Sequence, residues 1–179
     1  MEEAGEWTGL EEPDALEEET EAQAARPEIR SGLSKRIAQR VLKENGVTNP
    51  PVPVEEIARR LGFSLEARDL PPGVDARLLI VSVSSTKVIQ LARGQAAVRH
   101  RFSIAHELGH HFLGHSHGEA ESAEIEANVF AGELVIPRSW LTRDLKQGLT
   151  VAELVQRYQV SREVVFIAAK EGRLLGCLR

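Results

Sequence analysis

The residues from His106 to His110 read His-Glu-Leu-Gly-His, and this pentad constrains the fold more than any other segment of the chain. Residues four apart in an α-helix share a face, so His106 and His110 can bind one metal ion if the segment is helical. Glu107 then lies beside the open coordination position, where a general base is needed. Apolar residues around the pentad predict a partly buried helix: Phe102, Ala105, Leu108, Phe112 and Leu113.

A catalytic zinc ion takes three protein ligands, so a third ligand must come from another segment. A second helix, predicted from about Ala120 to Ile136, offers Glu124 and Glu126. Helical geometry separates these two carboxylates by about 200°, so only one of them can face the metal. Glu124 shares its side with small residues expected to face the core, whereas Glu126 is expected on the outward side. We therefore predict zinc ligands at His106, His110 and Glu124, with Glu126 as the alternative third ligand.

Two further features of the second helix support this site. Asn128 lies one turn beyond Glu124, and we expect its side chain to orient one of the ligand histidines through a hydrogen bond. Ala127 and Ala131 are small, which predicts close packing against the helix that contains the pentad. If these features were fortuitous, the pentad would be a solvated helix patch.

The remaining histidines are interpreted as structural or surface residues, namely His100, His111, His115 and His117. One of the three that follow the pentad could instead bind substrate or stabilise an oxyanion. The candidates for the oxyanion donor are His115, His117 and Tyr158.

Composition narrows the class of protein. The single cysteine, Cys177, excludes a disulfide framework and a cysteine-based zinc site. The first thirty residues are acidic rather than basic and then apolar, so no secretory signal peptide is expected. No apolar stretch is long enough to span a membrane. We therefore expect a cytoplasmic protein without a membrane partner.

Charge is unevenly distributed along the chain of 179 residues, whose net charge is −5. Residues 1–30 hold eleven acidic and two basic side chains, while the remaining 149 residues hold 16 acidic and 20 basic ones. We interpret the acidic segment as a solvated tail, with an intramolecular mask or partner-binding arm as the alternative. The rest of the chain is only mildly basic, which does not predict nucleic-acid binding.

Hydrophobic periodicity and turn residues predict the elements around the pentad. Two helices are expected first, at Ser31–Glu44 and Pro53–Leu61, and three strands follow, at Phe63–Ala67, Ala76–Val83 and Lys87–Leu91. Short connections favour antiparallel pairing of these strands. The strand Lys87–Leu91 is expected at an edge, where an extended substrate segment could pair with it.

Beyond Pro137 only short helices are predicted, ending with Thr150–Tyr158 and Ser161–Glu171. Thr150 and Glu153 have the spacing of a capping box at the start of the first of these two helices. We therefore expect an α+β fold. In it, a small antiparallel three-stranded sheet packs with the helices of the metal site, and a short segment similar to a helix-turn-helix follows.

Several stretches together resemble the ImmA/IrrE family of zinc metallopeptidases. They are Arg101–His110, Glu124–Ala131, Glu133–Pro137 and, near the N-terminus, Pro51–Ala58 followed by Leu61 and Gly62. The resemblance covers roughly residues 33–172. It implies a gluzincin-like site in which the ligands map to His106, His110 and Glu124, and the base maps to Glu107. It also implies a protein substrate, because family members typically cleave a helix-turn-helix repressor and so derepress stress, phage or mobile-element genes.

The sequence and this resemblance lead us to expect a zinc-dependent endopeptidase that cleaves such a repressor. The alternative is a non-catalytic module that contains zinc and sequesters a repressor or another partner. Direct DNA binding by residues 150–171 is not expected, because the chain is acidic overall and the turn at Gln159 lacks the usual glycine. The expected parts are an acidic tail at residues 1–30, a zinc metallopeptidase domain at 31–147 and a helical appendage at 148–179.

Overall fold

The computed structural model describes residues 29–81, 86–115 and 121–178. His117 and nearly all of the acidic tail expected at residues 1–30 lie outside these ranges. The described elements, in chain order, are the helices α2 (Ser31–Glu44) and α3 (Val54–Arg60), the strands β1 (Phe63–Arg68), β2 (Ala76–Val81) and β3 (Thr86–Ala92), the helices α4 (Ala97–Leu113), α5 (Glu121–Val135), α6 (Arg138–Lys146), α7 (Val151–Tyr158) and α8 (Arg162–Glu171), and a final 3-10 turn (Leu175–Cys177). The expected α+β class is confirmed. Among the described residues, no helix combines the length and hydrophobicity needed to cross a bilayer.

The sheet is mixed, with the strand order β1-β3-β2. The antiparallel pairing expected between β2 and β3 is present, with Leu78 opposite Ile89. The expectation of a wholly antiparallel sheet is wrong, because β1 runs parallel to β3, with Leu65 opposite Ile89. The physical reason is that β3 lies between β1 and β2 and runs opposite to β2. Because β2 itself runs opposite to β1, β3 and β1 are parallel. The prediction that Lys87–Leu91 forms an edge is also wrong, because β3 is paired on both sides.

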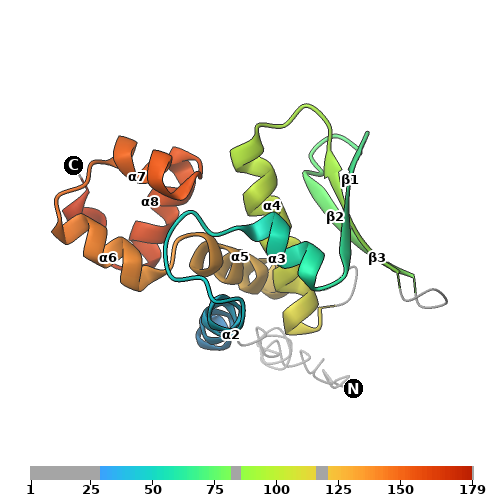
Figure 1. Cartoon of the computed structure of the whole chain (residues 1–179), viewed down its shortest axis with the longest axis horizontal. Coiled ribbons are helices and arrows are strands. Elements are labelled where there is room, and N and C mark those ends of the chain that lie inside the picture. The colour runs from blue at the N-terminus through green and yellow to red at the C-terminus, as the bar shows by residue number, and fades with distance from the viewer. Residues whose placement is uncertain (1–28, 82–85, 116–120, 179) are drawn as a thin grey trace, which may run out of the picture.

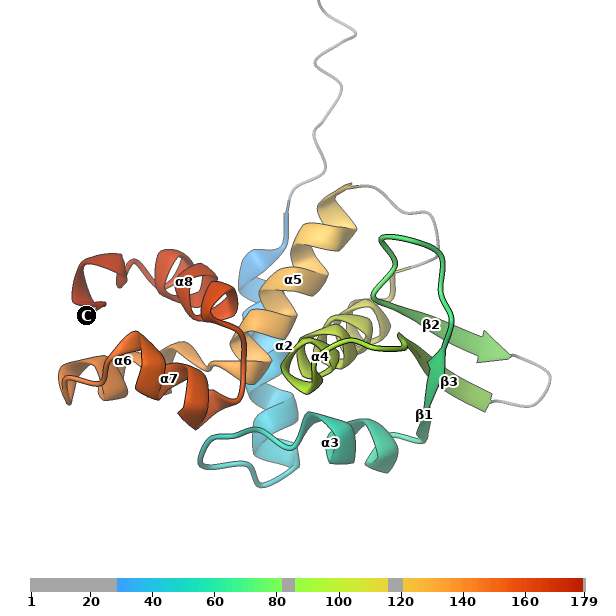
Figure 2. The same ribbon diagram turned by 90° about the horizontal axis from the view of Figure 1, so that it is seen from above.

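The helix α4 lies between the sheet and α5, while α3 packs against both α4 and β1 (Figures 1 and 2). On one side α4 meets β2 and β3, and on the other it packs against α5, whose far side is covered by α2. A single hydrophobic cluster joins these layers, and its members from α4 and α5 include Ile104, Leu108, Phe130 and Leu134. The pentad therefore lies on the helix at the centre of the molecule.

The far side of α5 differs from the expectation for its acidic residues. Glu126 was expected on the outward side, but it is only 3% exposed, and Glu133 on the same side of the helix is only 6% exposed. The physical reason is that α2 packs over this side and supplies polar partners. The Gln39 side chain donates a hydrogen bond to Glu133 at 2.8 Å, and Arg30, just before α2, binds Glu126.

The C-terminal helices begin and turn through local capping. The capping box of Thr150 and Glu153 is present at the start of α7. Gln159 ends this helix in the left-handed conformation with φ of 52°, the geometry that a glycine would adopt without strain. The Arg101 side chain of α4 donates to the carbonyl oxygens of Gln159 and Val52, at 3.2 and 2.7 Å. The turn between α7 and α8 is therefore joined directly to the helix that contains the pentad.

Candidate metal centre

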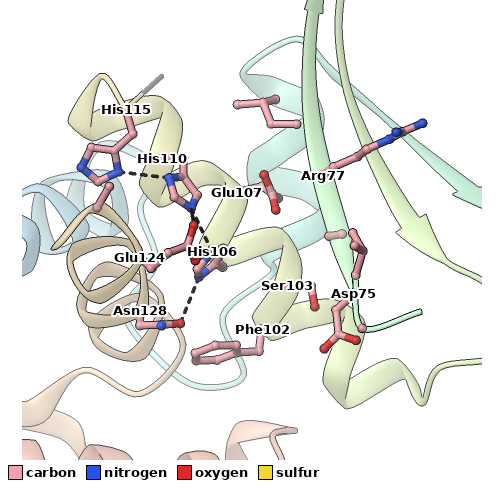
Figure 3. Close-up of a pocket in the computed structure, with 15 residues that line it drawn as sticks. Asp75, Arg77, Phe102, Ser103, His106, Glu107, His110, His115, Glu124 and Asn128 are labelled. Carbon is pink, nitrogen blue, oxygen red and sulfur yellow. Dashed lines mark hydrogen bonds and ion pairs between the residues drawn. The ribbon is translucent and has the colours of Figure 1, made fainter. Parts of the chain in front are cut away.

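Three side chains from α4 and α5 converge on one point (Figure 3). The Nε2 atoms of His106 and His110 are 2.9 Å apart. The carboxylate of Glu124 places one oxygen 3.3 Å from His106 Nε2 and the other 3.3 Å from His110 Nε2. The structure thus brings together the three residues predicted as ligands, and they form a group that could hold a metal ion.

The donor set of this group fits a zinc ion. Two imidazole nitrogens and one carboxylate are common ligands of catalytic zinc, and bonds of about 2.0–2.2 Å in a tetrahedron separate the ligand atoms by roughly 3.3 Å. The observed separations of 2.9 to 3.3 Å are close to this value. The Glu124 side chain is 58% exposed and all three residues line a cleft, so a metal ion held by them would be open to solvent.

The Nδ1 atom of His106 contacts Asn128, the residue predicted to orient a ligand histidine. His106 Nδ1 lies 3.0 Å from Asn128 Oδ1 (Figure 3). An amide oxygen accepts a hydrogen bond, so this contact places the proton on Nδ1 and leaves the Nε2 lone pair directed at Glu124. Burial lowers the pKa of His106, although the charge of Glu124 opposes this effect. The neutral imidazole favoured in this way is the form that binds metals.

Glu107 lies on the side of α4 that faces β2 (Figure 3), and it is buried. Burial raises the pKa of its carboxyl group from 4.5 to about 7, and the negative charge of Glu124 adds to this effect. A hydrogen bond from the backbone of Leu78 in β2 acts in the opposite direction. Glu107 therefore has a fixed position beside the ligand group and a pKa in the range of a general base.

A cleft of about 570 Å³ opens between the ligand group and the sheet. Its floor is α4, with Phe102, Ser103 and Glu107, and one wall is the loop and strand from Gly73 to Leu78. The sequence pattern does not predict this wall, because β2 comes close to the pentad only through tertiary packing. It also carries Asp75, which pairs with Arg99, and Arg77, which donates a hydrogen bond to Gln90.

The structure contradicts the interpretation of His115 as a surface residue. Its side chain is 3% exposed, and its Nδ1 lies 3.1 Å from Nδ1 of His110. His115 Nε2 contacts Glu126 at 3.1 Å. Glu126, the alternative third ligand, thus points away from the ligand group and belongs to this buried contact. Burial alone would raise the pKa of Glu126, but hydrogen bonds from Arg30 and His115 hold it at about 2.

His100, His111 and Tyr158 make packing or hydrogen-bond contacts within the fold. His100 Nε2 contacts the carbonyl oxygen of Ala92 at 2.9 Å. His111 packs edge-on against the Phe63 ring, and burial lowers its pKa. Tyr158 is fully buried, and its hydroxyl donates to Asp144 at 2.8 Å, so it does not line the cleft.

Comparison with known proteins identifies relatives of this architecture. A model of the peptidase M78 family, described as the IrrE N-terminal-like domain, matches residues 58–170. Eleven chains of solved structures match, and they include a Mycobacterium tuberculosis transcriptional regulator with 22% sequence identity and a TM-score of 0.56. That alignment covers 76% of this chain and 46% of the regulator, so the chain spans about half of that protein's length. A likeness at this identity shows the fold alone. No curated protein matches the sequence.

Proposed function

The chain belongs to the peptidase M78, or IrrE N-terminal-like, family, and we propose that it is a zinc-dependent endopeptidase whose substrate is a helix-turn-helix repressor. The observation that carries this proposal is the convergence of His106, His110 and Glu124 in a cleft that also contains Glu107. A structural zinc site is closed by four protein ligands, whereas catalytic sites use three and keep one position open. Three ligands beside an open cleft favour the catalytic type.

The proposed reaction divides the chemistry between the metal and the chain. Zinc held by these ligands would polarise the scissile carbonyl. It would also lower the pKa of its water, so that the water can lose a proton and act as a nucleophile near neutral pH. Glu107 accepts the proton from the attacking water and delivers it to the leaving amine. The hydrogen bond from Leu78 and the packing of α4 hold the Glu107 carboxylate in place for both transfers. His106 and His110 supply Nε2 atoms as ligands, and Asn128 orients the first of them.

The free edge of β2 is the proposed binding site for the scissile segment. The Leu78 backbone hydrogen-bonds to Glu107, so at this position β2 directs a backbone group away from β3 and towards the cleft. Extended peptides bind such edges through main-chain hydrogen bonds, with side-chain pockets providing selectivity. Gly73 to Leu78 line the cleft, so this segment would contact the residues of the substrate that flank the scissile bond.

A repressor is the proposed substrate because of the resemblance to the ImmA/IrrE family, whose typical substrates are helix-turn-helix repressors. Cleavage of such a repressor would derepress the genes that it controls, for example stress, phage or mobile-element genes. The reaction proposed here requires an extended segment of the repressor, such as an exposed linker, because only an extended chain can pair with β2. We propose that this zinc-dependent enzyme is cytoplasmic and cleaves the repressor there.

The test is co-expression of the wild-type protein or its Glu107→Gln variant with candidate repressors. The amide keeps the size of the side chain but cannot accept the proton, so repressor fragments are expected with the wild type and not with the variant. Zinc content, measured in both purified proteins, is expected to be equal. A stable complex of wild-type protein with uncut repressor would favour the non-catalytic alternative and reject the proposed activity.

A further inference from the structure

A chain of polar contacts leads from the candidate metal centre to Arg30, just before α2. His110 contacts His115 through their Nδ1 atoms, and His115 contacts Glu126 through Nε2, both at 3.1 Å. The Glu126 carboxylate receives hydrogen bonds from the Arg30 backbone N–H and guanidinium, at 2.7 to 3.1 Å. His115 and Glu126 are each 3% exposed. The contact between His115 and Glu126 is therefore buried, whereas the Arg30 side chain at the end of the chain is 50% exposed.

The end of α4 builds the first link of this chain. Gly114 adopts a left-handed conformation with φ of 73°, and its N–H bonds to the carbonyl oxygen of His111. The next residue, His115, donates its N–H to the carbonyl oxygen of His110 at 3.0 Å. In this helix-ending motif, the residue after the glycine packs against the residue five positions before it. The usual apolar pair of the motif is replaced here by His110 and His115.

The positions of the protons in this chain of contacts can be deduced by starting from the pair of Arg30 and Glu126. Glu126 is paired with Arg30, so its carboxylate accepts hydrogen bonds, and His115 must present N–H at Nε2. A neutral His115 then has a lone pair at Nδ1, which can only accept the proton of His110 Nδ1. With its proton on Nδ1, His110 carries its lone pair at Nε2, the atom that lies beside His106 and Glu124. This arrangement pairs a donor with an acceptor at each contact from Arg30 to His110 Nδ1, and it leaves only acceptors at the ligand group, as a cation site requires.

We propose that His115 and Glu126 are positioning residues for the metal, acting through His110 by fixing its tautomer and ring orientation. The inference rests on the proposed zinc site and extends it. The two ligand histidines are then oriented by different means: His106 by the neutral amide of Asn128, and His110 by a histidine backed by a carboxylate. A carboxylate at the end of such a chain raises the basicity of the ligand, and loss of comparable partners weakens metal binding by about 10–100-fold.

The test measures zinc affinity by competition with a chromophoric chelator, using three substitutions of histidine. His115→Phe keeps a buried ring but removes the acceptor, and it is expected to weaken zinc binding about 10–100-fold. His115→Asn places an amide oxygen near the position of Nδ1, as Asn128 does for His106, and it is expected to restore most of the affinity. His111→Phe is the matched control one residue from His110 and is expected to bind zinc like the wild type.

A second measurement separates a positioning role from a purely structural one. In the zinc-free protein, ring ¹⁵N chemical shifts are expected to show His110 with its proton on Nδ1 in the wild type and a mixture of tautomers in His115→Phe. Wild-type affinity in His115→Phe, or equal losses in His115→Phe and His115→Asn, would overturn the proposal. If His115→Phe does not fold, Glu126→Gln replaces it, and unchanged zinc affinity in that variant overturns the proposal. Failure of the wild type to bind zinc would instead reject the metal site on which the inference rests.

Discussion

Gly109 of α4 lies against the backbone of Ala127 in α5 so closely that a Cβ atom on Gly109 would be 3.1 Å from both the Cα and the carbonyl oxygen of Ala127. Contacts this short are rare, so any larger residue at position 109 must push the two helices apart. His106 and His110 lie on one of these helices and Glu124 on the other. The glycine within the pentad therefore sets the distance between the two halves of the candidate metal centre.

Gly109→Ala tests this relationship. Overpacking between α4 and α5 is expected to lower the free energy of unfolding by about 1–3 kcal/mol and to weaken zinc binding by separating Glu124 from the histidines. Gly132→Ala on α5 is the matched control, because its Cβ would meet no atom within 4 Å. This control is expected to raise stability by roughly 0.5–1 kcal/mol through helix propensity alone. Urea unfolding and zinc titration of both variants decide the matter, and a stabilised Gly109→Ala would refute the packing argument.

Removal of individual ligands is expected to abolish stoichiometric zinc binding. Glu124→Gln leaves α5 intact but replaces the carboxylate that faces both Nε2 atoms. Glu133→Gln, on the same helix but hydrogen-bonded to Gln39, is the control and should retain zinc. Elemental analysis after dialysis measures the result. Zinc at the wild-type level in Glu124→Gln would show that the third ligand has been assigned wrongly.

Zinc is expected to stabilise the fold, because the ligand group is formed only when α4 and α5 pack together. At a free zinc concentration about 1,000 times the dissociation constant, binding adds roughly 4 kcal/mol, which corresponds to an increase in Tm of roughly 8–16 °C for a chain of this size. Differential scanning calorimetry with and without zinc gives the shift. His110→Ala should show almost none of it, and an equal shift in this variant would place zinc elsewhere.

Tyr158 is expected to make the free energy of unfolding fall as the pH rises above 10. Burial and the neighbouring Asp144 carboxylate raise the pKa of its hydroxyl far above the ordinary value of 10. The folded protein therefore keeps this proton above pH 10, whereas the unfolded chain loses it. As pH rises above 10, this one group lowers the free energy of unfolding by up to about 1.4 kcal/mol per pH unit.

Tyr158→Phe is the comparison for this pH dependence, since it removes the titrating hydroxyl. Near neutral pH the variant loses a buried hydrogen bond to Asp144, which should cost about 1 kcal/mol. Between pH 10 and 11 its stability should fall less steeply than that of the wild type, as measured by urea unfolding at each pH. Parallel slopes for the two proteins would show that Tyr158 ionises normally.

Local periodicity was sufficient to predict much of the site. The helical spacing of His106 and His110, and of Glu124 and Asn128 one turn apart, placed these side chains on the faces where the structure has them. The proximity of Ala127 to the pentad also followed from its small size. These features depend on contacts within one helix or between two helices that follow each other in the chain, where pattern and packing agree.

Features that depend on distant parts of the chain could not be predicted in this way. Glu126 resembles a solvated acid in sequence, and only the packing of α2 and the approach of Arg30 make its burial favourable. The direction of β1 relative to β3 depends on β3 entering between its neighbours. His115 is the exception: Gly114 after a helix predicts a left-handed end, and with it the contact between His115 and His110.

The central claim is that the chain is a peptidase that depends on zinc and Glu107, and comparison of newly formed protein N-termini tests it most directly. Wild-type protein and Glu107→Gln, each shown to contain one zinc ion, are expressed at equal levels in cells of the source organism, and N-terminal peptides are quantified by mass spectrometry. The wild type is expected to produce at least one new N-terminus within an extended segment of a helix-turn-helix repressor, and the variant none. Identical sets of N-termini from the two zinc-loaded proteins would contradict the account.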